Sequence, residues 1–267
     1  MTTAFFDGVA LWAPTLPGWA QACAAFRSEG ALGGASPDAP LRRPAPELLQ
    51  PAERRRAPDT VALALEVATR AVEASGHAAR DLASVFASAH GDMAITDYVC
   101  ATLVSAPGLL SPTKFLNSVH NAASGYWSMA TGCMQASTAL SAFDCTFAAG
   151  LLEALSQCAA EARPVLLVGY DVEASGALAS VNASRGLLAV ALVISPVRGQ
   201  RSLARVDWAA HGGAAGTALR SAAARSVAGN AIADGLPLFE ALASGAPETL
   251  RLPLSAALSL QLALTPL

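Results

Sequence analysis

Three runs of consecutive apolar residues constrain the fold of this chain more than any other feature. They are LASVFASA (82–89), VLLVG (165–169) and LLAVALVI (187–194). A strand with one face in water alternates apolar and polar residues, whereas a strand that is covered on both faces is apolar throughout. Helical patterns lie before and between the first two runs, which is typical of βαβ units. The sequence therefore predicts an α/β domain with helices on both faces of its sheet.

A first strand is predicted over 4–12, and a loop over the Gly/Pro/Ser-rich run 30–46. Asp59 or Thr60 is expected to cap the next helix, which Gly76 ends, because short polar side chains favour helix starts and glycine favours helix ends. The other predicted elements are helix 61–75, helix 93–104, a loop and then a helix over 115–130, strand 137–143, helix 144–160, a flexible loop or weak helix over 211–229, and a terminal hairpin or two edge strands over 250–264.

The composition excludes several classes of protein. Charged residues make up 14% of the chain and hydrophobic residues 53%, which is the opposite of a disordered tail. The chain has one lysine, Lys114, and a pI of about 5.8, so it lacks the basic surface of a nucleic-acid-binding protein. The excess of apolar over charged residues indicates a second buried surface, which a permanent partner subunit would provide.

Signals for membranes, secretion and metals are weak. The longest uncharged stretch, 115–143, has the length of a bilayer span, but it contains Asn117, His120 and Gln135, so we expect it to be buried in a soluble core. The N-terminus carries Asp7 within its apolar run and lacks the basic start of a signal peptide. Five scattered cysteines show no metal-ligand spacing, and no glycine-rich phosphate loop is present. We therefore expect a reduced, cytoplasmic protein with no metal and no cofactor.

The junction STALSAFDCTFAAGLLEAL (137–155) joins a predicted buried strand to a predicted helix. Several enzyme folds place a nucleophile at such a junction, because the amides at a helix N-terminus stabilise a thiolate. Cys145 lies in the first turn, but free cysteine is usually a small buried apolar residue. The neighbouring Asp144 would compete for the helix amides and repel a thiolate, so we favour the structural interpretation of Cys145.

Four segments together resemble one protein family. They are SPTKFLNSVHNAASGYWSMATG (111–132), STALSAFDCTFAAGLLEA (137–154), PAPELLQPAERRRAP (44–58) and LASVFASAHGD (82–92). The family is that of the short β-ketoacyl-synthase-like proteins of chain-length-factor type, found in aryl polyene and xanthomonadin-like pigment biosynthesis. The resemblance covers most of the chain, from Phe6 to the C-terminal strands, and its SVHNAASGYWSMATG motif is long and specific.

The resemblance implies a thiolase-like (ketosynthase-like) α/β fold, with a mixed sheet covered by helices and a truncated second half. It implies a single domain over 1–267, made of an N-terminal thiolase-like half over about 1–197 and a shortened remainder over about 198–267. It also implies two protein partners. One is a catalytic β-ketoacyl-ACP synthase that forms a heterodimer with this chain, and the other is an acyl carrier protein.

The same resemblance argues against catalysis by this chain alone. A decarboxylating ketosynthase has a cysteine nucleophile at the strand–helix elbow, a glycine at a fixed spacing after it, and two histidines in its second half. If Gly150 is that glycine, the nucleophile position is Ala142, whereas a three-residue shift would place Cys145 there. Only one histidine, His211, follows the elbow. We therefore expect a non-catalytic chain length factor, and the alternative is a shortened active ketosynthase or acyltransferase that uses Cys145.

Large side chains around these motifs are candidates for the wall of an acyl tunnel or for the subunit interface. Volume alone can limit a chain in such a wall, because overpacking costs about 1–3 kcal/mol. His120 is either a lone acid/base or substrate contact, or a buried histidine that hydrogen-bonds the backbone near the interface, and the absence of an evident partner group favours the second interpretation. Each candidate is also compatible with plain core packing. The candidates are His120, Asn121, Tyr126, Trp127, Met129, Met134, Phe143 and Phe147.

A short charged run, Glu53-Arg54-Arg55-Arg56, precedes the predicted helix 61–75. Such a run is usually a solvated surface turn. The alternative follows from the resemblance, which implies an acidic carrier protein as partner. On that interpretation the three arginines dock the acidic helix of the carrier.

Overall fold

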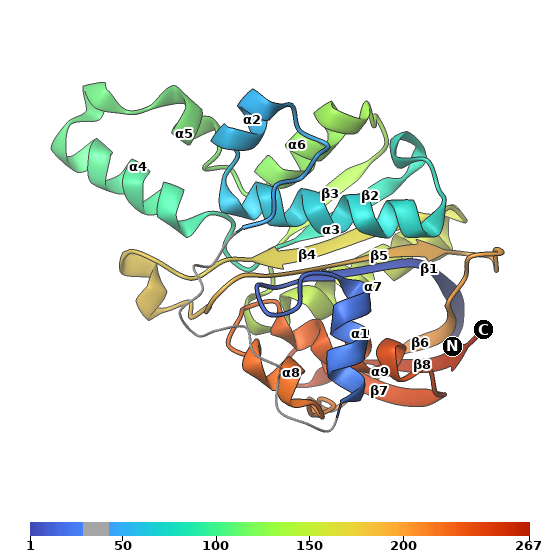
Figure 1. Ribbon diagram of the computed structural model, residues 1–267. Coiled ribbons are helices and arrows are strands. Elements are labelled where there is room, and N and C mark those ends of the chain that lie inside the picture. The colour runs from blue at the N-terminus through green and yellow to red at the C-terminus, as the bar shows by residue number, and fades with distance from the viewer. Residues whose placement is uncertain (29–42) are drawn as a thin grey trace.

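The computed structural model describes residues 1–28 and 43–267, and Figure 1 shows its helices arranged around a sheet. The strands are β1 (Thr2–Trp12), β2 (Ala83–Ala87), β3 (Ser137–Leu140), β4 (Val165–Asp171), β5 (Leu188–Ser195), β6 (Ala204–Gly212), β7 (Glu248–Pro253) and β8 (Leu258–Pro266). The α-helices are α1 (Trp19–Arg27), α2 (Pro51–Arg56), α3 (Asp59–Ser75), α4 (Met93–Ser105), α5 (Pro112–Leu116), α6 (Ala122–Thr131), α7 (Thr146–Glu161), α8 (Ala222–Ser226) and α9 (Leu236–Ser244). The 3-10 turns are η1 (Ala79–Asp81), η2 (Pro107–Leu109), η3 (Phe143–Cys145), η4 (Ala177–Ser180) and η5 (Ala233–Gly235).

The strands form one mixed sheet in the order β3-β2-β4-β5-β1-β6-β8-β7. β2 pairs in parallel with both neighbours, so that Val85 lies opposite Thr138 on one side and Leu167 on the other. The remaining strand pairs are antiparallel. The mixed α/β sheet is therefore confirmed, and the carboxyl ends of β2, β3 and β4 meet at one end of it.

Helices cover both faces of the sheet, as the uninterrupted apolar strands predict (Figure 1). Along β4, Val165 and Leu167 belong to the core under α7 and α9, while Leu166 and Val168 belong to the core under α3 and α6. Helix α7 approaches the sheet closely because Gly150 has no side chain, and a Cβ there would lie 2.8 Å from the Cβ of Ala87 on β2. This packing holds the N-terminus of α7 at the end of the sheet where the parallel strands stop.

Helix α3 is not capped as expected. Asp59 is its first helical residue rather than its cap, and Pro58 at the N-cap position makes no side-chain cap bond. Thr60 Oγ1 instead donates a hydrogen bond to Asp92 Oδ2 at 3.2 Å, so its side chain joins α3 to the start of α4. Gly76 ends the helix as predicted, with a positive φ of 75° that glycine adopts without strain.

The prediction that the uncharged stretch 115–143 is buried is wrong for most of its length. The stretch forms α5, α6 and β3, and few of its large apolar side chains reach a core: Trp127 is buried, and Tyr126 and Leu140 are partly buried. Leu116 is 71% exposed and Met134 is 93% exposed. The stretch forms an exposed apolar surface, and such a surface has the same uncharged composition as a buried segment.

Several element boundaries and elements differ from the predictions. Strand 137–143 ends at Leu140 and helix 144–160 begins at Thr146, because a tight turn separates them. The predicted loop or weak helix over 211–229 contains the end of β6 and the short α8. Strand β6 and the helices α1, α2 and α9 were not predicted. The terminal hairpin is confirmed as β7 and β8.

Two expectations concern the limits of the described chain. The predicted loop 30–46 lies largely outside the described residues. The predicted boundary between the two parts of the domain, near 197/198, falls in the connection between β5 and β6. Both strands belong to the same sheet, with β1 between them. Within residues 1–28 and 43–267, every helix is too short or too polar to cross a membrane.

Candidate functional site

A strand–turn–helix elbow forms where β3 leads into α7. Ser141 Oγ donates to the carbonyl of Ala89 at 2.8 Å, which ties the turn to the loop after β2. Phe143 then takes a φ of 52°, a conformation that costs a residue with a side chain about 1–3 kcal/mol. In strand–helix elbows of hydrolytic enzymes the nucleophile occupies the strained position. Here that position carries a phenyl ring, and Ala142 before it carries a methyl group, so neither residue supplies a nucleophilic atom.

The amides at the N-terminus of α7 already have a carboxylate partner. Asp234 accepts hydrogen bonds from the N–H of Phe147 at 3.3 Å and of Ala148 at 2.9 Å. Burial raises the pKa of the Cys145 thiol, and the charges of Asp234 and Asp144 raise it further. A thiolate at Cys145 is therefore disfavoured, which argues against its use as a nucleophile.

Asp171, the last residue of β4, holds the loop that follows β2. Its carboxylate accepts hydrogen bonds from Ser88 Oγ and from the N–H of Ala89, both at 2.8 Å, and burial raises its pKa to about 7. Ser88 Oγ in turn accepts from the N–H of Gly91 at 2.8 Å, and the carbonyl of Ser88 accepts from His120 Nε2 at 2.8 Å. The half-buried ring of His120 is thus bonded to the backbone.

His90 belongs to this site, although the sequence analysis did not single it out. It lies three residues after the end of β2, near the side chains of Asp144 and His120. Its two ring nitrogens are buried and have no hydrogen-bond partner among the described residues. Burial lowers the pKa of His90, so the ring is neutral at pH 7. The sequence signal that could have found His90 is its place after an apolar strand, because functional sites in α/β sheets gather at the carboxyl ends of parallel strands.

A cleft of about 360 Å³ opens beside the elbow. Asp144 and Asp234 line it, together with the segment 228–233. The side-chain amide of Asn230 fixes that segment by donating to the carbonyl of Asp171 at 3.0 Å. Asp234 and Asn230 are already bonded to the backbone, so the exposed carboxylate of Asp144 is the group that the cleft offers for polar contacts. Among the described residues, neither a thiol nor an imidazole lines the cleft. In the described part of the chain, no three His, Cys, Asp or Glu side chains converge as metal ligands.

β3 is an edge strand with an open outer side. The carbonyls of Ala136 and Leu140 accept from the N–H groups of Ser84 and Ser88 on the β2 side. Because backbone groups alternate along a strand, those of Ser137 and Ala139 point away from the sheet. They have no backbone partner among the residues that the structure describes. This edge can accept a strand from another chain.

Exposed apolar side chains gather in the segment that contains this edge. Of the sixteen large ones in the described residues, nine lie between 103 and 143. Five of them lie on residues 93–116, which form α4, η2 and α5 and are called the arm below; in Figure 1 the arm projects from one end of the molecule. An apolar surface of this kind is typical of a protein-binding face. The five on the arm are Leu103, Val104, Leu109, Phe115 and Leu116.

The predicted tunnel residues fall into two groups. Trp127 and Phe147 are fully buried, in separate cores on the two faces of the sheet. The other group reaches the surface, so only its members can contact a second chain or an acyl group directly. The exposed members are Asn121, Met129, Met134 and Phe143, and the half-buried ones are His120 and Tyr126.

The three predicted docking arginines have different environments. Arg54 Nη2 donates to the carbonyl of Leu49 at 3.1 Å and is half-buried, so it holds α2 in place. Arg55 and Arg56 are exposed. Neither of them makes a side-chain hydrogen bond or an ion pair with another described residue.

Comparisons with known proteins identify relatives of this architecture. Residues 33–253 match the family described as β-ketoacyl synthase, N-terminal domain. A search of curated protein sequences returns no match. Solved structures, by contrast, resemble the chain over nearly its whole length.

Two of these structures are matched over nearly their whole chain, and a third over less than half of its chain. A ketosynthase (ApeO) in complex with its chain length factor (ApeC) from Xenorhabdus doucetiae is matched with a TM-score of 0.74 and 20% identity, over 99% of this chain and 100% of that chain. A type II PKS acyl-carrier protein in complex with its ketosynthase bound to the hexaketide (AntDE:AntF) gives a TM-score of 0.73 and 10% identity, over 100% and 99%. Ketosynthase twelve of the bacillaene polyketide synthase from Bacillus amyloliquefaciens gives 0.59 and 13%, over 79% of this chain and 45% of that chain. The fold is therefore ketosynthase-like, in a chain shorter than a full ketosynthase.

Proposed function

We propose that this chain, which belongs to the β-ketoacyl synthase N-terminal-domain family, is a non-catalytic chain length factor. It pairs with a catalytic β-ketoacyl-ACP synthase and helps to shape the tunnel that holds the growing acyl chain. The resemblance of its sequence motifs supports a role of this assembly in aryl polyene biosynthesis. Five unpaired cysteines are consistent with action in the cytoplasm.

The observation that carries the proposal is the open edge of β3 beside an elbow whose thiol, Cys145, has a raised pKa. An enzyme of this family would need a reactive group at the elbow, whereas this elbow has Phe143 at its strained position and Asp234 on the α7 amides. A partner subunit would need an edge to pair with and an apolar surface to cover, and β3 and the arm offer both. Pairing through β3 would extend the sheet into the second chain.

The exposed candidates near β3 support a role in shaping the tunnel. Met129, Met134 and Phe143 come from α6, from the segment before β3 and from the elbow, so a subunit docked on β3 would meet them. Side chains there would limit the space for an acyl chain by their volume. Phe143 is the sharpest candidate, because its ring is exposed at the strained position of the elbow, directly after Ala142, the predicted nucleophile position.

Arg55 and Arg56 are our candidates for docking an acyl carrier protein. Both are exposed on α2, and a carrier with an acidic helix would find paired cations there. The double substitution R55A/R56A should weaken carrier binding and make it less sensitive to salt. The matched control is Arg80→Ala, at an exposed arginine on η1. Equal binding by both variants at low salt would reject this docking role.

Co-expression with a catalytic ketosynthase of the aryl polyene type, followed by size exclusion with light scattering, tests the proposal. We expect a one-to-one complex, and self-association of this chain when it is expressed alone. A chain that stays monomeric and ignores the ketosynthase would contradict the partner role.

The same complex decides whether this chain has its own chemistry. Cys145→Ser should leave elongation by the complex unchanged, because the thiol lacks the environment of a nucleophile. Loss of activity with an intact complex would favour the alternative of an active, shortened acyltransferase. A cysteine-to-serine change in the partner's own active site should abolish activity and serves as the positive control.

A further inference from the structure

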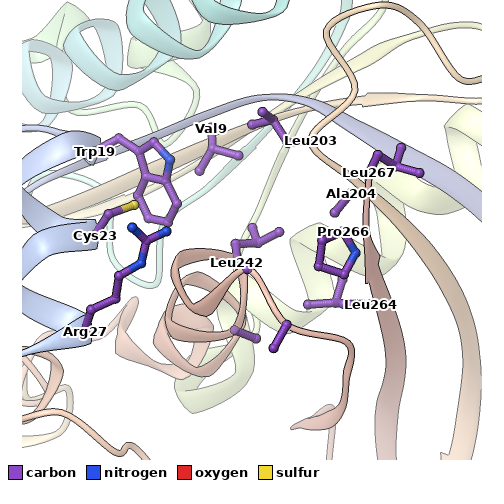
Figure 2. Close-up of a pocket in the computed structure, with 13 residues that line it drawn as sticks. Val9, Trp19, Cys23, Arg27, Leu203, Ala204, Leu242, Leu264, Pro266 and Leu267 are labelled. Atoms are coloured by element: carbon purple, nitrogen blue, oxygen red, sulfur yellow. The ribbon is translucent and has the colours of Figure 1, made fainter.

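A pocket of about 310 Å³ lies between α1, α9 and the strands β1, β6 and β8 (Figure 2). Three strands, β2, β4 and β5, separate β1 from the edge strand β3. The pocket is therefore distinct from the elbow, its cleft and the proposed partner edge. Its size falls at the lower end of the range of small-molecule sites, roughly 300–1,000 Å³.

Most of the pocket wall is aliphatic. Leu242 lies on α9, and Leu264 and Pro266 lie on β8. Leu203 and Leu267 also line the pocket and are 48% and 45% exposed, so apolar surface continues from the pocket towards solvent. Such a wall favours an alkyl chain over a polar ligand.

The polar side chains of the pocket stand at one end and come from one helix. Trp19, Cys23 and Arg27 are spaced four residues apart on α1, which puts them in a row on one face. Figure 2 shows the guanidinium of Arg27 lying near the side chains of Cys23 and Trp19, opposite the aliphatic wall of β8. All three side chains are hydrogen-bond donors, and burial raises the pKa of the Cys23 thiol, which keeps its proton in place.

Arg27 is oriented by the protein, and among the described residues its terminal nitrogens have no hydrogen-bond acceptor. Its Nε donates to the carbonyl of Ala243 on α9, which fixes the plane of the guanidinium across the pocket end. The terminal nitrogens of Arg27 and the indole N–H of Trp19 make no hydrogen bond within the described residues. A cluster of donors with a fixed guanidinium matches an acceptor-only anion, and a carboxylate matches it with two oxygens.

We propose that this pocket binds a medium-chain fatty acid as its carboxylate. The head group accepts hydrogen bonds from Arg27 and Trp19, and the alkyl chain lies along Leu242 and Leu264. This site is independent of the proposed chain-length role, because it shares no residue with the elbow or with β3.

Calorimetric titration of the full chain, or of its ketosynthase complex, with sodium decanoate tests the proposal. Decan-1-ol serves as the uncharged probe of the same length. We expect one decanoate per chain, and we expect Arg27→Met to weaken decanoate binding by about tenfold while changing decan-1-ol binding by less than about twofold. Arg80→Met, at an arginine on η1 that does not line the pocket, should change neither.

A second variant keeps the test decisive if Arg27→Met disturbs α1. Ala246 lines the pocket at an exposed position, so Ala246→Phe should obstruct it without altering a core. We expect this variant to lose binding of both probes and to unfold at the same temperature as the parent protein. Absence of decanoate binding to the parent chain would overturn the proposal. Binding that neither Arg27→Met nor Ala246→Phe alters would overturn it too, because the probe would then occupy another surface.

Discussion

β3 and β7 are the two edge strands of the same sheet, and their outer sides differ. At β7, the N–H of Thr217 donates to the carbonyl of Arg251 at 2.9 Å, and Thr217 Oγ1 accepts from the N–H of Arg251 at 2.9 Å. Pro253, two residues further along the same side, has no N–H to offer. At β3, the outward groups of Ser137 and Ala139 have no backbone partner among the described residues.

Among the described residues, the chain blocks the outer side of β7 and leaves that of β3 open. An exposed edge invites pairing with other chains, and proteins cover or interrupt edges that have no partner. The apolar arm and the exposed side chains up to Phe143 belong to the stretch of chain that contains β3. We interpret β3 as the edge kept for a partner subunit and β7 as the edge kept from pairing.

The largest predicted effect comes from proline at the open edge. Ala139→Pro removes an outward N–H and leaves the bonds between β3 and β2 intact. We expect the affinity for the ketosynthase to fall by about 3 kcal/mol, or roughly a hundredfold in Kd. Thr249→Pro at the corresponding outward position of β7 is the matched control, and it should bind normally. Calorimetric titration of both variants checks this, and equal affinities would remove the distinction between the edges.

A charge on the arm should have the next largest effect. Leu109 and Leu116 are 78% and 71% exposed, so L109D/L116D should fold normally. In the complex, the partner would then bury two aspartate charges against its own surface. We expect roughly tenfold weaker binding and less self-association of the free chain. Val197→Asp is the control, since Val197 is 70% exposed in the turn after β5. If both variants lose affinity equally in the same titration, the arm is not the contact surface.

The buried carboxyl group of Asp234, beside the elbow, should make the free energy of unfolding depend on pH. Burial raises the pKa of Asp234 to about 7, above its ordinary value of 3.8, so the folded chain holds this proton more tightly than the unfolded chain. The stability from Asp234 is fully present below about pH 4 and is lost as the pH rises towards 7. Asp234→Asn removes this dependence, so the unfolding free energy of the parent minus that of the variant should fall by about 1–3 kcal/mol from pH 5 to pH 8. Urea unfolding measures it, and a difference that is constant with pH would contradict the buried-carboxyl account.

The smallest predicted effect concerns thiol reactivity at the elbow. Because burial and the charges of Asp234 and Asp144 raise the pKa of Cys145, iodoacetamide at pH 7 should modify it more slowly than free cysteine. Asp234→Asn should speed the modification by a few-fold. Mass spectrometry of the modified peptide follows both rates. Faster labelling of Cys145 than of free cysteine would mean that the elbow carries an activated thiol.

The sequence predicted the parts of the fold that repeat a simple pattern. The apolar strands β2, β4 and β5 were found because a doubly covered strand has no polar face. The burial of 115–143 was predicted wrongly, because an exposed apolar surface has the composition of a core. Strand β6 was missed, because its burial changes along its length and follows neither strand pattern.

The candidate site was predicted in place but not in detail. The elbow was found from the junction of strand and helix, and His120 from its motif. Asp234 accepts a hydrogen bond from the N–H of Phe147, but the two residues are 87 positions apart in sequence. Asp234 was missed because only folding brings them together. His90 was missed because one histidine after a strand has no spacing that marks it.

Hydrogen–deuterium exchange of the amides of Ser137 and Ala139, with and without the ketosynthase, tests the central claim most directly. The account predicts fast exchange in the free chain, and protection of both amides in the complex, with exchange at Thr249 on β7 unchanged. Protection that appears at β7, or a complex in which the β3 amides exchange as fast as before, would contradict the assignment of β3 as the partner edge.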